Sequence, residues 1–171
     1  MTLPDVLAFL QITEDLATPV WLDGGWGVDA LLGTQTRAHA DLDIVIEARH
    51  SPTLVHYLAR GGFEPIRRAD TSPWNLGYGD RRGRQVDLRV IEFDRAGDGH
   101  FGPEDICPAE ALRGYGTVGD RTVRCIAAQW QVRFHTGYAV DENDWRDVSA
   151  LRERFGIAVP PDYDDFVGGR R

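Results

Sequence analysis

The chain has 171 residues, of which 42% are hydrophobic, so it is long and apolar enough to bury the core of one domain, with or without a small appendage. Its 19 basic residues are all arginine, which excludes a lysine Schiff base and a Walker A phosphate-binding loop. The formal net charge of −8 argues against a nucleic-acid-binding surface, whereas the 19 aspartates among the 27 acidic residues suit hard cations.

The first sixty residues alternate helical and extended patterns. The N-terminal segment is amphipathic, and it lacks both the basic start and the uninterrupted apolar run of a signal peptide or membrane span. We therefore expect a cytoplasmic protein that binds no membrane. The patterns predict a helix, a strand, a helix, a buried strand and a helix over residues 4–17, 20–23, 26–32, 42–47 and 51–61.

The rest of the chain adds two hairpins and then two helices. Because helices alternate with strands and the hairpins add antiparallel pairs, the fold class is α/β, with a mixed twisted sheet flanked by helices over residues 1–105 and a small helical extension over 106–171 that packs on it. Cys107 and Cys125 are too few and too far apart for a disulfide scaffold. The predicted segments are strands at 75–80 and 85–93, a loop at 94–99, a hairpin at 116–126, helices at 127–137 and 142–155, and an irregular tail after Pro160-Pro161.

Asp41 and Asp43 stand two residues apart at the start of the strand predicted over residues 42–47. Side chains alternate across a strand, so both carboxylates point to the same face. Two carboxylates that are forced together repel each other unless a cation lies between them, and their hard oxygen atoms favour magnesium. The alternative is that the pair only caps the strand and faces solvent.

Asp87 is a third acid on a predicted strand, between the apolar Val86 and Leu88. A lone charge is costly to bury, so this carboxylate needs a partner. If its strand pairs beside residues 42–47, Asp87 converges with Asp41 and Asp43. The alternative is an ion pair with an arginine on the same sheet, such as Arg89.

The turn at Gly24-Gly25 joins a predicted strand to a predicted helix. Without a side chain, such a turn lets backbone N–H groups and the helix N-terminus approach a phosphate closely. Arg37 lies just before the acid pair and is placed to neutralise a phosphate oxygen. Alternatively, Arg37 pairs with Asp29 and only shapes the loop.

Residues 25–30 also satisfy the G-x-G-x-x-A pattern of dinucleotide-binding oxidoreductases, with Glu47 at the end of the next strand. Three features count against this interpretation. The following helix is too short for a crossover, acids open the next strand where they would repel a pyrophosphate, and hairpins stand where further βαβ units belong.

These motifs together resemble the signature of small antibiotic nucleotidyltransferases. The nearest likeness is to lincosamide nucleotidyltransferases and the aminoglycoside 2″-nucleotidyltransferase group, within the DNA polymerase β-like superfamily. The likeness spans most of the chain and is densest over residues 22–46. The stretches that carry it are residues 22–33, Thr36-Arg37-x-His39-x-Asp41-Leu42-Asp43, Gln85-Val86-Asp87-Leu88, and His135-Thr136-Gly137-Tyr138 followed by Asp144 and Asp147.

The resemblance implies a role for each of these groups. Asp41 and Asp43 would hold two magnesium ions that bridge ATP or another nucleoside triphosphate. Asp87 would ligate one metal and act as general base on a hydroxyl of a small acceptor, which expels pyrophosphate from the α-phosphorus. The backbone at Gly24-Gly25 would hold the outgoing phosphates. The resemblance also implies a homodimer that pairs about the acceptor site.

The acceptor side rests on weaker signals. Tyr138 and Asp144 are candidate substrate-binding residues, and Trp26 and Trp74 are candidate pocket walls. Asp144 and Asp147 share a helix face and either hold a cationic acceptor or are first-turn acids that the helix dipole favours. A catalytically silent binding module, such as an antitoxin-like relative, is the remaining alternative, because a complete set of acids does not prove turnover.

Overall fold

The computed structural model describes residues 1–103 and 105–168. Its main sheet has the strand order β3-β4-β5-β2-β1-β9-β8, and a small β6–β7 hairpin continues from β5. The strands are β1 (Val20–Leu22), β2 (Leu42–Glu47), β3 (Glu64–Ile66), β4 (Asn75–Gly79), β5 (Gln85–Phe93), β6 (Gly99–His100), β7 (Ile106–Cys107), β8 (Gly114–Val118) and β9 (Arg121–Cys125). The helices are α1 (Leu3–Asp15), α2 (Gly24–Leu32), α3 (Ser51–Arg60), α4 (Ala128–Phe134), α5 (Glu142–Phe155) and α6 (Asp164–Val167), with 3₁₀ turns at Ala111–Arg113 and Pro161–Tyr163.

The sheet is mixed, which confirms the predicted fold class. Strand β2 runs parallel to β5 and antiparallel to β1. A dinucleotide-binding unit needs β1 and β2 to be parallel, so the antiparallel pairing excludes that interpretation of the glycine motif. The register places Asp43 directly beside Asp87.

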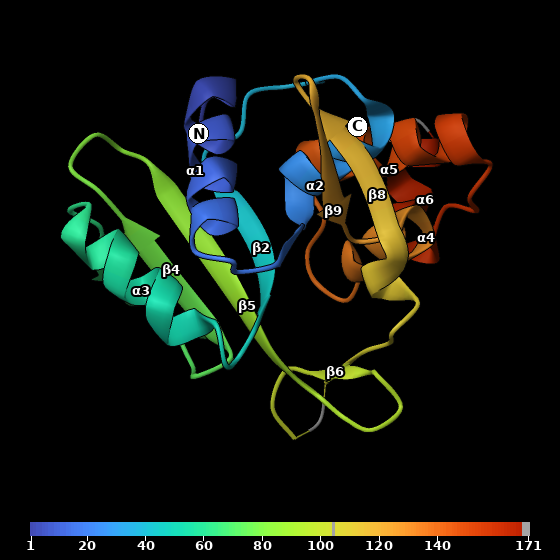
Figure 1. The fold of residues 1–171 in the computed structure, drawn as a ribbon. Helices are drawn as coiled ribbons and strands as arrows, with labels where there is room; N and C mark the ends of the chain where they lie inside the picture. The colour runs from blue at the N-terminus through green and yellow to red at the C-terminus, as the bar shows by residue number, and fades with distance from the viewer. Residues whose placement is uncertain (104, 169–171) are drawn as a thin grey trace.

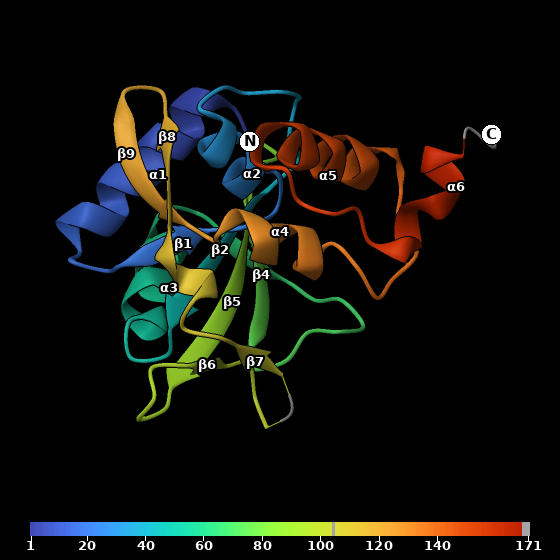
Figure 2. The ribbon, with the colours of Figure 1, turned by 90° about the vertical axis from the view of Figure 1, so that its right-hand side faces the viewer.

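Helices cover both faces of the sheet (Figures 1 and 2). On one face, apolar side chains of α1 and α3, such as Phe9 and Leu54, pack with Ile44 and Leu88 of the sheet. On the other face, Val45 and Ile91 belong to a second cluster. Helices α2, α4 and α5 form a third cluster, which gathers on the right of Figure 1. The central strands are therefore buried on both faces, as their β-branched composition predicts.

Most elements lie close to their predicted positions. Strand β2 has its predicted bounds, β5 has the predicted range 85–93, and Gly33 ends α2 in the left-handed conformation. Helix α2 begins at Gly24 rather than Trp26, because Asp23 accepts a hydrogen bond from the Gly24 N–H and caps the helix two residues earlier. Strands β3, β6 and β7, each of two or three residues, were not predicted.

The C-terminal part contributes to the sheet as well as to the helices. Hairpin β8–β9 extends the main sheet through pairing of β9 with β1, so the sheet continues past the boundary predicted near residue 105. The sequence predicted an irregular segment after Pro160-Pro161, and this prediction was wrong. Tyr163 is fully buried and lies 6.0 Å from Trp145 and 6.2 Å from Phe166 between ring centroids, and this aromatic cluster orders the 3₁₀ turn and α6.

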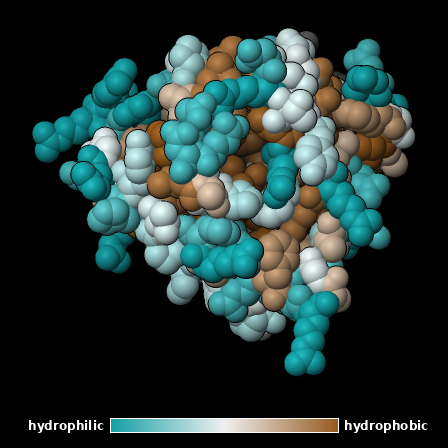
Figure 3. Space-filling view, in the orientation of Figure 1, coloured by the Kyte–Doolittle hydropathy of each residue, from teal (hydrophilic) through white to brown (hydrophobic). Residues whose placement is uncertain are grey.

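The face of the molecule seen in Figure 3 carries polar side chains around its rim, with apolar areas between them. Within residues 1–103 and 105–168, no helix combines the length and the apolar character needed to cross a bilayer.

Candidate nucleotide-transfer site

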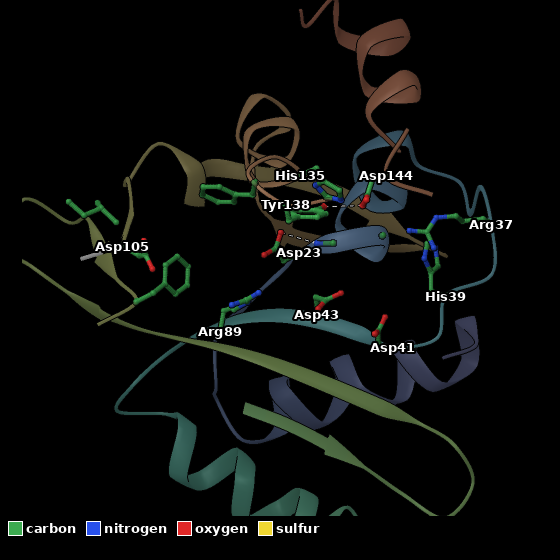
Figure 4. Close-up of a pocket in the computed structure, with 15 residues that line it drawn as sticks. Asp23, Arg37, His39, Asp41, Asp43, Arg89, Asp105, His135, Tyr138 and Asp144 are labelled. Atoms are coloured by element: carbon green, nitrogen blue, oxygen red, sulfur yellow. Dashed lines mark hydrogen bonds between the residues drawn. The ribbon is translucent and has the colours of Figure 1, made fainter. Parts of the chain in front are cut away.

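A cavity of about 520 Å³ lies between the sheet and the helical part (Figure 4). Strand β2 forms its floor, the N-terminus of α2 and the loop before β2 form one side, and the β6–β7 hairpin and the end of α4 form the other. The residues that line it are Asp23, Gly24, Gly25, Arg37, His39, Asp41, Asp43, Arg89, Phe101, Asp105, Ile106, Phe134, His135, Tyr138 and Asp144.

Asp41 and Asp43 point into this cavity from the start of β2 (Figure 4). Burial raises the pKa of Asp43 well above its ordinary value, and repulsion from Asp41, Asp23 and Asp87 raises this pKa further. Neither Asp41 nor Asp43 forms an ion pair within the described residues. The two carboxylates therefore make an anionic floor that a bound cation would stabilise.

The glycine turn approaches this floor closely. Gly24 has a φ of +54°, and a Cβ atom on it would lie 3.0 Å from Cγ of Asp43 and would overlap its Oδ2. A Cβ on Gly25 would lie 2.7 Å from Nη2 of Arg37 and would overlap the ring of His39. Only glycine fits at these two positions, so the N-terminus of α2 is held directly against the acids and Arg37.

Asp87 is a buried neighbour of Asp43, but Arg68 holds its carboxylate. The two terminal nitrogens of Arg68 each lie 3.0 Å from an oxygen of Asp87. The Gln85 amide nitrogen bridges Asp87 and Asp41 at 3.2 and 3.3 Å. Arg89 was named from the sequence as an example of an arginine partner for Asp87, and this choice of residue was wrong. The Arg89 side chain lines the cavity instead.

The three acids are adjacent, yet they are not gathered around one point. Among residues 1–103 and 105–168, no three histidine, cysteine, aspartate or glutamate side chains are arranged to hold a metal ion. The bidentate contact with Arg68 gives the reason, because it directs the oxygens of Asp87 toward the loop after β3. Of these three acids, Asp41 and Asp43 line the cavity and Asp87 does not.

Arg37 pairs with Asp147 of α5, not with Asp29. Its Nε and Nη2 atoms lie 3.1 and 2.6 Å from the two oxygens of Asp147, whose side chain is 1% exposed. These hydrogen bonds raise the pKa of Arg37 above its ordinary value. Asp29 instead contacts Nε2 of His39 and accepts hydrogen bonds from Thr36. Asp147 was expected either to hold a cationic acceptor or to be a first-turn acid that the helix dipole favours. It does neither, because it forms a buried ion pair with Arg37.

Tyr138 and Asp144, the candidate acceptor-binding residues, line the opposite wall. The Tyr138 hydroxyl donates a 2.9 Å hydrogen bond to Asp144, and burial together with this contact raises the pKa of Tyr138. His135 is buried beside them, and its Nδ1 lies 2.7 Å from the carbonyl oxygen of Gln131. Phe101 and Ile106 add apolar surface, so this wall offers both acidic and apolar contacts.

Comparison with known proteins decides the family. A family model described as aminoglycoside-2″-adenylyltransferase matches residues 5–151. The chain belongs to this family. A lincosamide resistance protein of Staphylococcus haemolyticus is 28% identical over 159 residues, which cover 89% of this chain and 95% of that protein. A 2″-aminoglycoside nucleotidyltransferase of Escherichia coli is 27% identical over 118 residues, which cover 68% of this chain and 62% of that protein.

Solved structures agree with this assignment. A lincosamide antibiotic adenylyltransferase with bound lincomycin has 26% identity and a TM-score of 0.78, over 89% of this chain and 97% of that chain. An aminoglycoside enzyme in complex with adenylyl-2″-tobramycin shares the fold, with 18% identity and a TM-score of 0.69, over 90% and 89% of the two chains. The protein is thus a nucleotidyltransferase, and the motif resemblance is confirmed.

Two predicted pocket residues of this nucleotidyltransferase lie outside the cavity. Trp26 is 2% exposed and packs in the main core, with its ring 4.9 Å from that of His39. Trp74 packs against the same core and beside Gly102. Helix α2 is buried nearly all round, so an aromatic residue in it contributes to the core rather than to a cavity wall.

The nucleotidyltransferase cavity also contains residues that the sequence reasoning missed. His39 lies within the matched motif and is buried between Trp26 and Gly25, but its role was not considered. Asp23 faces Asp43 across the cavity, and the Asp-Gly-Gly pattern of a capped helix start was the available signal (Figure 4). Two further residues contact the acids from outside the cavity lining: Gln85 stands two residues before Asp87 in the matched stretch, whereas Arg68 had no signal because only the fold brings it to Asp87.

Proposed function

We propose that this nucleotidyltransferase moves AMP from ATP, with magnesium, to a hydroxyl group of a small antibiotic of the lincosamide or aminoglycoside class. One observation carries the proposal: the paired acids Asp41 and Asp43 face the glycine turn and Arg37 across a single cavity. The description of the family and the names of its relatives support adenylyl as the transferred group. Their antibiotic substrates support the acceptor class.

The chemistry of the cavity floor fits a divalent cation. Asp41 and Asp43 form no ion pair in the described chain, and burial together with repulsion from neighbouring acids raises the pKa of Asp43, although Arg89 opposes this shift. Hard oxygen donors of this kind suit magnesium. These two residues would hold the metal, which when bound would polarise the phosphate oxygens and lower the pKa of the attacking hydroxyl.

The opposite side of the cavity supplies groups for the phosphates. Asp23 accepts the Gly24 N–H, so the N–H of Gly25 is the first one at the start of α2 that is left for a ligand in the cavity, and an anion is stabilised at a helix N-terminus. Arg37 stands over Gly25 and adds a positive charge. The acceptor oxygen would bond to the α-phosphorus while the bond to the pyrophosphate oxygen breaks, and these groups would hold the departing pyrophosphate.

Asp87 is proposed as the proton acceptor for the attacking hydroxyl and as an additional metal ligand. It lies directly beside Asp43 in the sheet. One of its oxygens accepts from Arg68 alone, whereas the other accepts from both Arg68 and Gln85. The first oxygen thus has the larger remaining capacity to accept a proton.

The acceptor would lie against the wall formed by Tyr138, Asp144, Asp105, Phe101 and Ile106. Carboxylates attract the amino groups of a cationic acceptor, and the apolar side chains cover its less polar faces. A homodimer stays a prediction that sedimentation can test.

The test incubates the protein with ATP and magnesium and a panel of lincosamides and aminoglycosides, followed by mass spectrometry. A mass gain of ~330 Da, one AMP, is expected on at least one compound, as metal-assisted transfer requires. Asp43→Asn should abolish the gain, and Asp120→Asn, in the exposed β8–β9 turn, is the matched control that should keep it. Full transfer by Asp43→Asn would contradict the proposed role of the acid pair.

A further inference from the structure

The Arg37–Asp147 ion pair joins parts of the chain that are 110 residues apart. Arg37 belongs to the loop before β2 and lines the cavity, whereas Asp147 lies on α5, is 2% exposed and does not line the cavity. A buried carboxylate that holds a cavity arginine in two hydrogen bonds fixes the direction of its guanidinium group. The pair therefore places a C-terminal helix behind the proposed phosphate site.

The geometry of the pair leaves a specific edge of Arg37 available. A guanidinium group has five N–H donors in a planar fork. Asp147 takes one on Nε and one on Nη2, and the carbonyl oxygen of Ala38 takes one on Nη1 at 3.3 Å. One N–H on each terminal nitrogen has no partner among the described residues. Two such donors match the spacing of two phosphate oxygens.

The position of that edge coincides with the glycine turn. Nη2 of Arg37 lies where a Cβ on Gly25 would come within 2.7 Å, so the fork rests directly over the N-terminus of α2. The ring of His39 lies next to Arg37 on the same side of Gly25 and is itself held by Asp29. The uncommitted donors of Arg37 thus lie beside Gly25 at the start of α2, where Asp23 already takes the Gly24 N–H.

We propose that Asp147 is a positioning residue, which holds the guanidinium group of Arg37 so that its free edge binds the triphosphate of the nucleotide. This inference rests on the proposed function, because it assumes that ATP binds at the glycine turn. It assigns to α5 a part in nucleotide binding, although α5 contributes to the cavity lining only through Asp144.

The test measures equilibrium binding of ATP and of adenosine, in magnesium, to the full chain. Asp147→Asn should weaken ATP binding by about tenfold or more, the loss expected for a charge-assisted bidentate contact, and should leave adenosine binding unchanged. The KM for ATP should rise by the same factor with little change in kcat. Glu142→Gln removes an exposed carboxylate from the same helix and is the matched control, with both affinities unchanged.

A second variant keeps the inference testable if Asp147→Asn does not fold. Arg37→Lys keeps a cation for Asp147 but loses the fork, and it should weaken ATP binding to a similar degree. The double variant should bind ATP no more weakly than either single variant, because the two residues act as one unit. Failure of the wild type to bind ATP would overturn the proposed function itself. Normal ATP binding by folded Asp147→Asn, or equal losses for ATP and adenosine, would overturn the inference alone.

Discussion

Replacing Gly24 with alanine separates the two constraints on the glycine turn. The first constraint is the backbone, because Gly24 has a φ of +54° and a left-handed conformation costs an alanine about 1–2 kcal/mol. The second is the space above the acid floor, where the new methyl group would lie 3.0 Å from Cγ of Asp43 and would overlap Oδ2. Ordinary contact begins near 3.4 Å, so the Asp43 carboxyl group must shift by at least several tenths of an ångström.

Gly33 provides the matched control at the other end of the same helix. Its φ is +72°, and a Cβ on it would meet nothing within 4 Å. Both alanine variants should therefore lose about 1–2 kcal/mol, which for a chain of this length lowers Tm by about 2–8 °C. Only Gly24→Ala should also lose turnover, by about 100-fold, because displacement of a reacting group by up to 1 Å has that effect.

The assay pairs thermal unfolding with initial rates of AMP transfer, measured at a temperature where both variants are folded. Gly33→Ala should retain turnover within about twofold, since its only effect is the free-energy cost of placing an alanine in the left-handed backbone conformation. Wild-type turnover in Gly24→Ala would refute the close approach of the turn to Asp43. An equal loss of turnover in Gly33→Ala would show that backbone strain, rather than contact with the acid, controls the site.

Three further predictions follow from the acids and the thiols. Asp43→Asn should raise the stability of the metal-free protein at neutral pH. The wild type loses stability as the pH rises from 3.8, the ordinary pKa of an aspartate, through the raised pKa of Asp43 in the folded state, and asparagine removes this loss. Unfolding of both proteins in EDTA from pH 4 to pH 8 measures the difference in stability. Equal stability of the two proteins at both ends of that range would contradict the repulsion among the acids. Asp87→Asn should lower kcat far more than it weakens ATP binding, and an unchanged kcat would exclude Asp87 as the base. Burial raises the pKa of Cys107 and Cys125 to about 12, so a thiol reagent at pH 8 should label the folded chain much more slowly than the chain in denaturant; rapid labelling of the native protein would contradict their burial.

The sequence was sufficient to predict the framework of the site. Alternation placed Asp41 and Asp43 on one face at the start of β2, and Asp87 was expected to lie beside them if its strand paired with β2, a pairing that β2 and β5 make in register. Strong periodic patterns of this kind arise because the side chains of the central strands are buried, and any correct fold must bury them. The family resemblance rested on the same short stretches and is confirmed by the match over residues 5–151.

The partners of the charged residues were not predictable in the same way. Arg68 rather than Arg89 holds Asp87, and Asp147 rather than Asp29 holds Arg37. Each of these pairs joins a loop to a distant element, and loop conformation leaves no periodic signal in the sequence. The wrong expectation for Trp26 has a related cause, because only the tertiary packing of α2 shows that this helix is buried on most of its surface.

The central claim is that the α-phosphoryl group of ATP, with its nucleoside, passes to the acceptor. Parallel reactions with α-³²P-labelled and γ-³²P-labelled ATP, magnesium and a responsive antibiotic test it most directly. We expect the α-label to appear in the antibiotic and the γ-label to be released as pyrophosphate. Transfer of the γ-label to the antibiotic would contradict the claim, as would recovery of the modified antibiotic without the α-label.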